Sequence, residues 1–193
     1  MQCFVYEKDT EILKRIQVLL QQKKRVILAI DGRCGAGKST FAQFLQQKTG
    51  AEVIHADDFF LRPEQRTSER MQQPGGNIDY ERMKQEVIDH LLVPQVFTYT
   101  PYECAVQALG TPKLVSAAPV LIVEGAYSMH PYFGSYYDIA VVMTADTEER
   151  LHRIGARGHH NNLEQFRTRW MPMEEAYLKA FDIESRADFI LYT

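Results

Sequence analysis

The segment Gly32-Arg33-Cys34-Gly35-Ala36-Gly37-Lys38-Ser39 matches the pattern G-x-x-x-x-G-K-[ST] at every fixed position. Small residues in this pattern let backbone N–H groups turn inward around phosphate oxygens, and the helix that follows adds the positive end of its dipole. Lys38 would bring a compact charge to the β- and γ-phosphates, and the Ser39 hydroxyl can ligate Mg²⁺. The expected nucleotide contacts are Gly32, Arg33, Cys34, Gly35, Ala36, Gly37, Lys38, Ser39 and Thr40.

The sequence on either side of this segment agrees with a phosphate-binding loop, or P-loop. Val26-Ile27-Leu28-Ala29-Ile30 is a short apolar run, typical of a strand buried on both faces of a parallel sheet. The stretch from Lys38 to Lys48 has apolar residues at helical spacing, and Gly50 stands where a helix stop is expected. A glycine-rich turn that matched the pattern by chance would need neither the preceding strand nor the following helix.

Apolar strands and helices alternate along the chain. Further strands are expected at Glu52–Ala56, Val120–Val123, Ile139–Met143 and Ala187–Leu191. Helices are expected at Thr10–Lys23, at Tyr80–Leu92 and, opened by the capping-box pattern Asp146–Glu149, toward Arg157. Residues 96–115 are ambiguous, although Thr98–Thr100 and Lys113–Val115 could pair as a β-ribbon. The alternation predicts a parallel α/β sheet with ligands at the carboxyl ends of its strands.

The length of 193 residues fits a single domain, residues 1–193, with 45% hydrophobic and 24% charged residues. Residues 1–24 are expected to form an N-terminal helical segment. Residues 61–79 turn polar and contain Pro63, Pro74, Gly75 and Gly76, so we expect a mobile segment on the substrate side. Residues 150–170 are expected to form a lid region.

The charge and cysteine content narrow the function classes. A net charge of −3 gives no general attraction to nucleic acid or to an anionic membrane, so neither is an expected partner. Three scattered cysteines, no apolar run of membrane-spanning length and no secretory pattern at the N-terminus favour the cytoplasm. Cys34 could be redox-active, because a helix N-terminus lowers the pKa of a thiol, but a tolerated small residue is the preferred interpretation.

Two acidic features suggest phosphoryl transfer. Asp57 and Asp58 follow the strand expected at Glu52–Ala56, where a carboxylate could accept a proton from an attacking hydroxyl or help to hold a metal. Glu124 ends the apolar run Val120–Val123 and resembles a Walker B acid, which binds Mg²⁺ directly or through water. The alternatives are a helix cap or a solvated acidic pair for the aspartates, and an ordinary acidic residue after a strand for Glu124.

A basic feature points the same way. Arg150, Arg153 and Arg157 are spaced to lie along one side of the helix that follows Asp146. A cationic lid of this kind would stabilise the charge of the transferred group and exclude water. A solvated basic helix face is the alternative.

Taken in order, these motifs resemble those of the uridine kinases, a group that includes phosphoribulokinase, pantothenate kinase and nicotinamide riboside kinase. The likeness covers the P-loop, the D-x-F at Asp57–Phe59, the E-G at Glu124–Gly125, the arginines of 150–157 and the A-D-x-I at Ala187–Ile190. It implies a three-layer P-loop NTPase fold with a mostly parallel five-stranded sheet and a small helical lid. It also implies ATP and Mg²⁺ as cofactors, a nucleoside-like small-molecule acceptor, and assembly as a homo-oligomer.

The resemblance also assigns roles to residues. Asp57 is the implied general base, with Lys38, Arg153 and Arg157 as its catalytic companions. Ser39, Glu124 and Asp57 are the candidate metal contacts. Asp79 in Asn77-Ile78-Asp79 resembles an aspartate that binds ribose hydroxyls, so the candidate acceptor contacts are Asp57, Asp79, Tyr102 and Arg169.

The sequence departs from uridine kinases in the base pocket, where Tyr102 is kept but the histidine and arginine that follow are missing. Asp57–Glu64 is closer to the D-D-F-F-K-P-E of nicotinamide riboside kinases. The leading hypothesis is transfer of the γ-phosphate of ATP to the 5′-hydroxyl of uridine or a related nucleoside. The alternatives are another small alcohol (nicotinamide riboside, pantothenate or a sugar phosphate) or a regulatory ATPase.

Two aromatic features are not assigned to the site. His159-His160 lacks the spacing that would place both rings on one metal from a helix. Trp170 and Phe166, four residues apart, are interpreted as packing residues rather than as a base-stacking pair.

Overall fold

Five parallel strands form the central sheet of the computed structural model, which describes residues 8–159 and 162–193. The strands are β1 (Val26–Gly32), β2 (Glu52–His55), β7 (Val120–Glu124), β8 (Ile139–Thr144) and β9 (Phe189–Tyr192), in the order β2-β7-β1-β8-β9. All five expected strands are confirmed, with ends shifted by one or two residues. The parallel five-stranded α/β sheet is confirmed as well.

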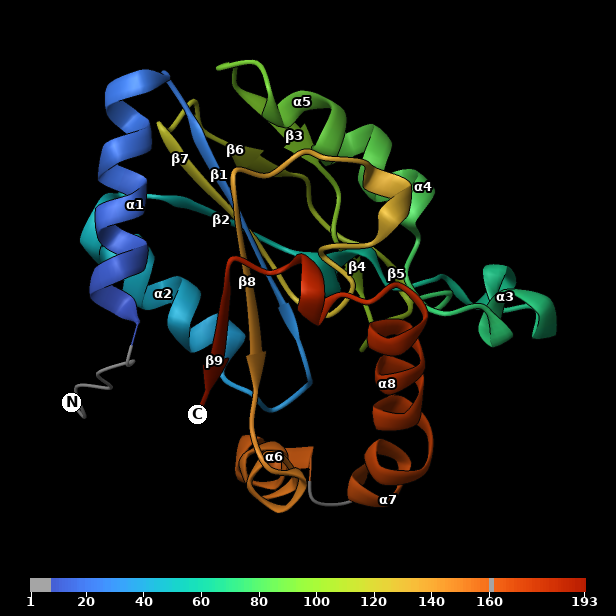
Figure 1. Cartoon of the computed structure of the whole chain (residues 1–193). Helices are drawn as coiled ribbons and strands as arrows, with labels where there is room; N and C mark the ends of the chain where they lie inside the picture. Colours follow the sequence, from blue (N-terminus) through green and yellow to red (C-terminus); the bar gives the residue numbers. More distant parts are fainter. Residues whose placement is uncertain (1–7, 160–161) are drawn as a thin grey trace.

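One face of the sheet is covered by α1 (Asp9–Gln22) and α2 (Lys38–Thr49), which lie side by side in Figure 1. Ile12, Ile16, Phe41 and Leu45 are the main side chains that these helices bury against the strands. The helical spacing of these residues is what lets two helices bury one stripe each.

The other face is covered by a continuous helix and by α8 (Met171–Ala180). The continuous helix runs through α4 (Tyr80–Met83), a π-helical turn (Lys84–Ile88) and α5 (Asp89–Leu91). Together with the first pair of helices this gives three layers, as expected. None of the helices in the described ranges is long and apolar enough to cross a membrane.

The strand register decides where the polar residues after the strands meet. β1 lies between β7 and β8, and Ile30 pairs with Glu124, which in turn pairs with His55 on β2. Because the strands are parallel, their carboxyl ends share one edge of the sheet. The P-loop, the Asp57 turn and Glu124 therefore meet at that edge.

The helix boundaries follow the local sequence in most places. α2 begins after Gly37 and ends at Gly50, both in the left-handed region. α6 (Thr147–Ile154) begins after Asp146 as expected, but the Asp146 side chain makes no capping hydrogen bond. The expected capping box is therefore not formed. Glu149, its other member, pairs with Arg153 instead, with 2.7 Å between Glu149 Oε1 and Arg153 Nε.

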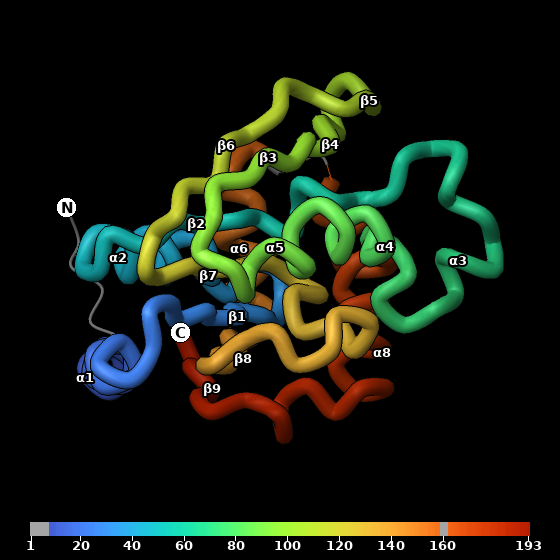
Figure 2. Tube along the Cα trace, turned by 90° about the horizontal axis from the view of Figure 1, so that it is seen from above, coloured from blue at the N-terminus to red at the C-terminus, as the bar shows by residue number. Residues whose placement is uncertain are grey.

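Two segments outside the core contribute to the site. Residues 61–79 contain a 3₁₀ turn (Pro63–Gln65) and α3 (Ser68–Gln72), and a Phe60–Ile78 bridge joins their ends. The expected ribbon is confirmed as β3 (Phe97–Tyr99) paired antiparallel with β6 (Lys113–Val115). With the β4 (Tyr102–Glu103) and β5 (Ala108–Leu109) pair it projects from one side of the molecule in Figure 2.

The region expected to be a lid follows β8. α6 leads into a π-helical turn, Gly155–His159, and the chain resumes with α7 (Leu163–Gln165). A second π-helical turn, Phe166–Trp170, runs into α8. In Figure 1 α6 and α7 lie at the end of the molecule where β1 enters the P-loop.

Candidate active site

The backbone of the P-loop is shaped by its glycines. Gly32 has φ 122°, and a Cβ at this position would lie 2.1 Å from the carbonyl oxygen of Met143 on the neighbouring strand. Gly35 has φ 75°, and a Cβ there would lie 2.7 Å from the carbonyl oxygen of Arg150. Only glycine fits positions that combine a positive φ with such close backbone contacts. α2 has no side-chain cap, so the amide groups of its first turn are open.

Lys38 curls back over this loop. Its ammonium is buried and donates to the carbonyl oxygens of Gly32, at 2.8 Å, and Arg33, at 3.0 Å. An ammonium has three donors, so one remains for a ligand.

A pocket of about 740 Å³ opens beside the loop, at the carboxyl ends of β1, β2 and β7. This volume lies within the range of small-molecule sites, roughly 300–1,000 Å³. Five P-loop residues line it: Cys34, Gly35, Gly37, Lys38 and Ser39. Asp57, Glu124 and Arg157 also line the pocket. The sheet edge therefore brings the loop, two candidate acids and a lid arginine into one cavity.

Asp57 and Asp58 point in different directions. Asp57 lines the pocket, and its side chain is exposed there. Asp58 does not line it, because its Oδ2 accepts hydrogen bonds from the Tyr99 hydroxyl at 2.7 Å and from Lys113 Nζ at 2.8 Å. Of the two carboxylates, Asp57 is the one placed to reach an acceptor beside the P-loop.

The pKa of Asp57 is raised to about 6. The largest cause is desolvation, because the pocket walls enclose the carboxylate although it faces the cavity. Lys38 lowers the pKa, while the negative charges of Glu124 and Glu174 raise it. A carboxylate with this pKa is a better proton acceptor near neutral pH than an ordinary aspartate.

Glu124 lies at the end of β7, is buried and lines the pocket. Its Oε1 lies 2.5 Å from His55 Nδ1. This hydrogen bond is the largest cause of the raised pKa of His55, against desolvation, which lowers it. His55 thus holds one oxygen of Glu124, and the carboxylate keeps capacity for a second partner.

Arg150 and Glu174 hold the P-loop at Cys34. Arg150 Nε donates to the Cys34 carbonyl oxygen at 2.9 Å, and the Cys34 amide donates to Glu174 Oε2 at 3.0 Å. The two side chains are buried and lie 3.2 Å apart. We call this arrangement of Arg150, Glu174 and Cys34 the loop clamp. Sequence reasoning missed Glu174, since nothing in its local sequence relates it to a segment 140 residues away.

The clamp also decides the chemistry of Cys34. Burial, followed by the charge of Glu174, raises the pKa of its thiol to about 12. The lowering expected at a helix N-terminus is outweighed, so the thiol stays protonated at neutral pH. Arg33, in contrast to Cys34, does not line the pocket, because its guanidinium pairs with Glu175 and Glu184, each at 2.6 Å. Thr40 is exposed outside the pocket.

The three lid arginines do not share one role. Arg157 lines the pocket, whereas Arg150 belongs to the clamp. Arg153 pairs with Glu149, donates to the Thr193 hydroxyl at 2.8 Å and lies 3.4 Å from the Gly35 carbonyl oxygen of the P-loop. All three side chains thus lie beside the P-loop, but only Arg157 lines the pocket.

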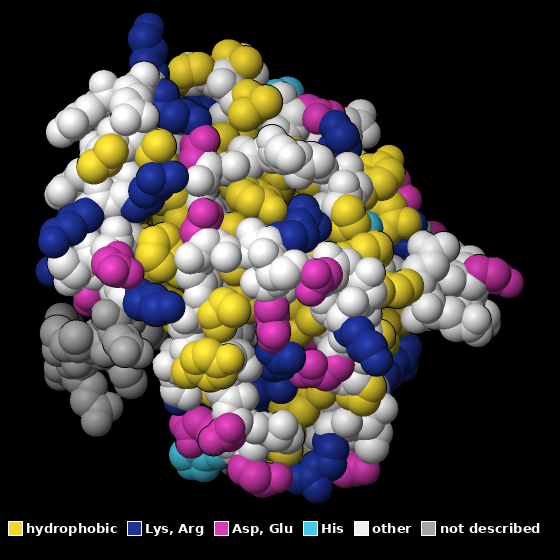
Figure 3. Space-filling model, viewed as in Figure 1, with side chains coloured by type: hydrophobic (Ala, Val, Ile, Leu, Met, Phe, Trp, Pro, Cys, Tyr) yellow, Lys and Arg dark blue, Asp and Glu magenta, His cyan; other side chains and the backbone are white. Residues whose placement is uncertain are grey.

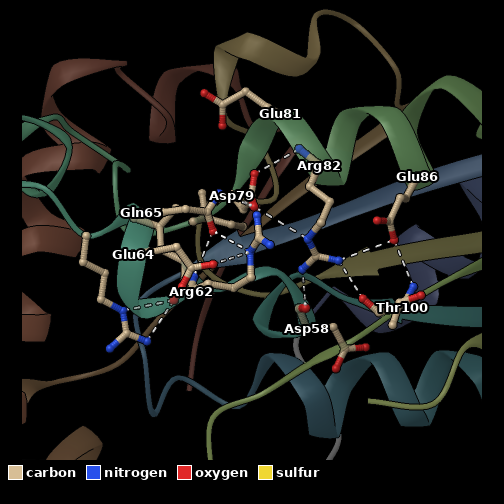
Figure 4. A network of polar contacts seen from close by, with 12 residues as sticks. Asp58, Arg62, Glu64, Gln65, Asp79, Glu81, Arg82, Glu86 and Thr100 are labelled. Atoms are coloured by element: carbon tan, nitrogen blue, oxygen red, sulfur yellow. Dashed lines mark hydrogen bonds and ion pairs between the residues drawn. The ribbon is translucent and has the colours of Figure 1, made fainter. Parts of the chain in front are cut away.

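Asp79 does not line the pocket. Its Oδ1 accepts from the Arg82 amide at 3.1 Å, and its Oδ2 accepts from Gln65 Nε2 at 2.7 Å. Figure 4 shows it inside a network with Arg82 and Gln65. The assignment of Asp79 as a sugar contact is not supported, since its carboxylate caps α4 and holds the 61–79 segment.

Two other candidate acceptor contacts also lie outside the pocket lining. The hydroxyl of the buried Tyr102 accepts from Arg66 Nη2 at 3.2 Å. The guanidinium of Arg169 stacks on the Trp170 ring, with 4.7 Å between its central carbon and the ring centroid. Phe166 packs against the small cluster of Leu151, Ile154 and Met171, and both Phe166 and Trp170 also line the pocket. The side chains of His159 and His160 lie outside the described residues.

Asn77, Arg66 and Tyr127 line the pocket although sequence reasoning did not select them. The N-x-D pattern of 77–79 drew attention to its aspartate rather than to its asparagine.

Asp31 was also not selected from the sequence. It is fully buried, and its carboxylate accepts from the Gly32, Tyr127 and Met129 amides and from the Tyr177 hydroxyl. It joins the P-loop to the chain after β7 and to α8.

The fold agrees with solved structures of low sequence identity. The "possible uridine kinase" from Bacillus stearothermophilus is 22% identical, with a TM-score of 0.66, over 93% of this chain and 98% of that one. The "putative fructose transport system kinase" from Silicibacter sp. TM1040 is 20% identical, with a TM-score of 0.68, over 92% and 97%. A "putative P-loop containing kinase" from Saccharomyces cerevisiae is 14% identical, with a TM-score of 0.65, over 96% and 98%.

These likenesses confirm the three-layer P-loop fold. No curated protein matches this chain at the level of sequence. The family described as AAA domain matches residues 28–176, which span the P-loop, Asp57, Glu124, the lid and the clamp residue Glu174. The chain therefore belongs to this AAA domain family and has the P-loop fold found in the kinase structures above.

Proposed function

We propose that this chain is an ATP-dependent kinase that transfers the γ-phosphoryl group to an alcohol of a small molecule. The observation that carries the proposal is the shared pocket, in which Asp57 faces the same 740 Å³ cavity as the P-loop residues Lys38 and Ser39. A nucleotide switch needs a phosphate cradle, but it does not need a proton acceptor and room for a second substrate beside that cradle.

The residues divide the work between binding and proton transfer. The loop amides, the first turn of α2 and Lys38 would hold the phosphates and stabilise charge as the γ-phosphoryl group moves. Asp57 would accept the hydroxyl proton as the alcohol oxygen bonds to phosphorus and ADP leaves. Arg157 would approach the transferred group from the lid side and help to exclude water.

The donor set also fits Mg²⁺. Ser39, Asp57 and Glu124 offer hard oxygen ligands to the same pocket. No cluster of three or more His, Cys, Asp or Glu side chains suited to a metal occurs in the described part of the chain. Mg²⁺ is commonly held by one or two protein oxygens together with substrate phosphates, so this sparse set suits it. When bound, the ion would neutralise charge on the phosphates.

The resemblance to uridine kinases makes the 5′-hydroxyl of a nucleoside the first acceptor to test. Basic and acidic side chains are interspersed on the face drawn in Figure 3. The expected absence of a nucleic-acid or membrane partner stays a prediction, as does the homo-oligomer that the resemblance implies.

The decisive experiment measures ADP release from ATP and Mg²⁺ against a panel of nucleosides, sugars, sugar phosphates and hydroxy acids. We expect turnover that depends on one class of alcohol, with one phosphorylated product per ADP. ATP hydrolysis that no alcohol stimulates, but that a protein partner does, would favour a regulatory ATPase and overturn the proposal.

A further inference from the structure

We propose that the acceptor carries an anionic group, a phosphate or a carboxylate, held by Arg66, and a hydrogen-bond donor that faces Asn77. This inference rests on the proposed kinase function and names the class of its second substrate. It follows from an account of which polar groups in the pocket already have partners within the chain.

Arg66 is a positioned cation without a carboxylate. Its Nε and Nη2 donate to the Leu61 carbonyl oxygen at 3.0 and 2.8 Å, and Nη2 also lies 3.2 Å from the Tyr102 hydroxyl. These neutral partners fix the plane of the guanidinium but leave its charge unbalanced. Nη1 has no hydrogen-bond partner among the described residues. A guanidinium held in this way is prepared for the planar recognition of a phosphate or carboxylate.

Seven arginines in the described segments are paired with carboxylates. Arginines outside the pocket lining that pair with carboxylates are Arg33, Arg62, Arg70, Arg82, Arg150, Arg153 and Arg167. The two that line the pocket, Arg66 and Arg157, have no carboxylate partner within residues 8–159 and 162–193. Arg15, Arg25, Arg169 and Arg186, which lie outside the pocket lining, also have no carboxylate partner among the described residues, but both arginines that line the pocket lack one.

The position of Arg66 assigns it to the acceptor. Arg157 comes from the lid, beside the loop that would hold the nucleotide, whereas Arg66 comes from the 61–79 segment. On this side Arg66 shares the pocket lining with Phe60, Leu61, Met71 and Cys104, none of which carries a carboxylate. A negative group on the acceptor would therefore meet a cation and apolar walls.

Asn77 supplies an independent observation. It is only 6% exposed and lines the pocket. Its side chain hydrogen-bonds Tyr127, but its Oδ1 has no hydrogen-bond partner among the described residues. A buried carbonyl oxygen left unpaired is costly, so a site of this kind favours a ligand that donates a hydrogen bond to it. A second hydroxyl or an N–H on the acceptor would serve.

The partners of the carboxylates near the pocket also disfavour a positively charged acceptor. Asp79, the acid expected to bind acceptor hydroxyls, has both carboxylate oxygens engaged with Arg82 and Gln65. Of the carboxylates that line the pocket, Glu124 is held by His55 and Glu174 by the loop clamp, and Asp57 is reserved for the proton. A cationic group would lie near Arg66 without a counter-charge.

The test compares matched neutral and anionic alcohols in an ADP-release assay with saturating ATP and Mg²⁺. The series are glycerol, glycerate and glycerol 3-phosphate, and ribose with ribose 5-phosphate, with uridine as the neutral nucleoside. We expect at least one anionic member to exceed its neutral parent in kcat/KM by about tenfold or more. Comparing glycerate with glycerol 3-phosphate separates a carboxylate-bearing from a phosphate-bearing substrate.

Variants then locate the anion. Arg66→Gln should lower kcat/KM for the anionic member by about 10- to 100-fold, mainly through KM, and leave the neutral parent unchanged. Added KCl should weaken the wild-type preference and have little effect in this variant. Arg66→Lys should restore part of the preference. Arg62→Gln, four residues away and outside the pocket lining, is the control and should behave as wild type. Asn77→Ala should raise KM for both members.

Each other outcome decides between the two proposals. Preference for neutral alcohols, or equal losses for both members in Arg66→Gln, overturns the anionic acceptor and leaves the kinase standing. If nucleotide binds but no alcohol of either series is phosphorylated, the kinase proposal and this inference are both wrong.

Discussion

The two ends of the pocket differ in whether their charged side chains are paired with one another. Around the P-loop, charged side chains are paired with one another, as in the loop clamp of Arg150 and Glu174 and in the contacts of Arg33 with Glu175 and Glu184. On the acceptor side, Arg66 has no carboxylate partner and the amide oxygen of Asn77 no hydrogen-bond donor within the part of the chain that the structure describes. The nucleotide end is thus organised by the chain itself, whereas the acceptor end is electrostatically complete only with a ligand.

This difference has a physical reason. A P-loop must present its amides in one geometry, and buried ion pairs add directional constraints to a glycine-rich backbone that would otherwise be permissive. An acceptor site gains specificity by leaving polar groups unsatisfied until the right substrate supplies their partners.

The largest expected effect comes from removing the proton acceptor that faces both the P-loop and the acceptor. Asp57→Asn should lower kcat by about 10²- to 10⁴-fold, because an amide cannot accept the hydroxyl proton. Nucleotide binding, measured by calorimetry, should persist. The matched control is Asp58→Asn, since that carboxylate binds Tyr99 and Lys113 away from the pocket. Equal losses in both variants would contradict the assignment of Asp57.

The second prediction concerns the loss of an ion pair beside the P-loop. Glu174→Ala leaves the buried guanidinium of Arg150 without its nearest carboxylate, and should lower the free energy of unfolding by about 3–5 kcal/mol in urea titrations. Glu174→Gln keeps an acceptor for the Cys34 amide and should lose less. A loss for Glu174→Ala below about 1 kcal/mol would show that the clamp contributes little to stability.

The third prediction uses the pH dependence of the free enzyme. Asp57 must be deprotonated to act, and its pKa is raised to about 6, so kcat/KM should rise about tenfold from pH 5 to pH 7 and then level off. The charge of Glu174 raises this pKa, so Glu174→Gln should move the midpoint to lower pH. Titration of ATP itself could not produce such a shift. An unchanged midpoint would remove Asp57 as its origin.

The smallest expected effect concerns His55, whose side chain is 44% exposed. Its raised pKa means that the bond to Glu124 stabilises the fold most below the unfolded pKa of histidine, and less as pH rises through the folded value. His55→Ala should therefore cost less than about 1 kcal/mol at pH 5.5, after solvent screening, and less at pH 9. His152→Ala, exposed on α6, is the control. A larger cost at pH 9 would contradict this sign.

Local sequence was sufficient for the sheet and for the nucleotide end. The apolar runs of β1, β7 and β8 are long enough and uniform enough to have one interpretation, and the P-loop pattern encodes its own backbone geometry. Because parallel strands end at one edge, the nearness of Asp57 and Glu124 to the loop also followed from the order of elements. These features depend on residues that are neighbours in the chain or in the sheet.

Tertiary packing alone decided the rest. Glu174 reaches Cys34 from α8, Arg66 is oriented by Tyr102, and Asp79 turns away because Gln65 and Arg82 engage it. Of the three lid arginines, only Arg157 lines the pocket. Sequence patterns name the residues that can do chemistry, but which polar groups already have partners depends on contacts between distant segments. Among the described residues, the charge of Arg66 has no carboxylate partner and the Asn77 Oδ1 has no hydrogen-bond donor, whereas both oxygens of Asp79 are engaged.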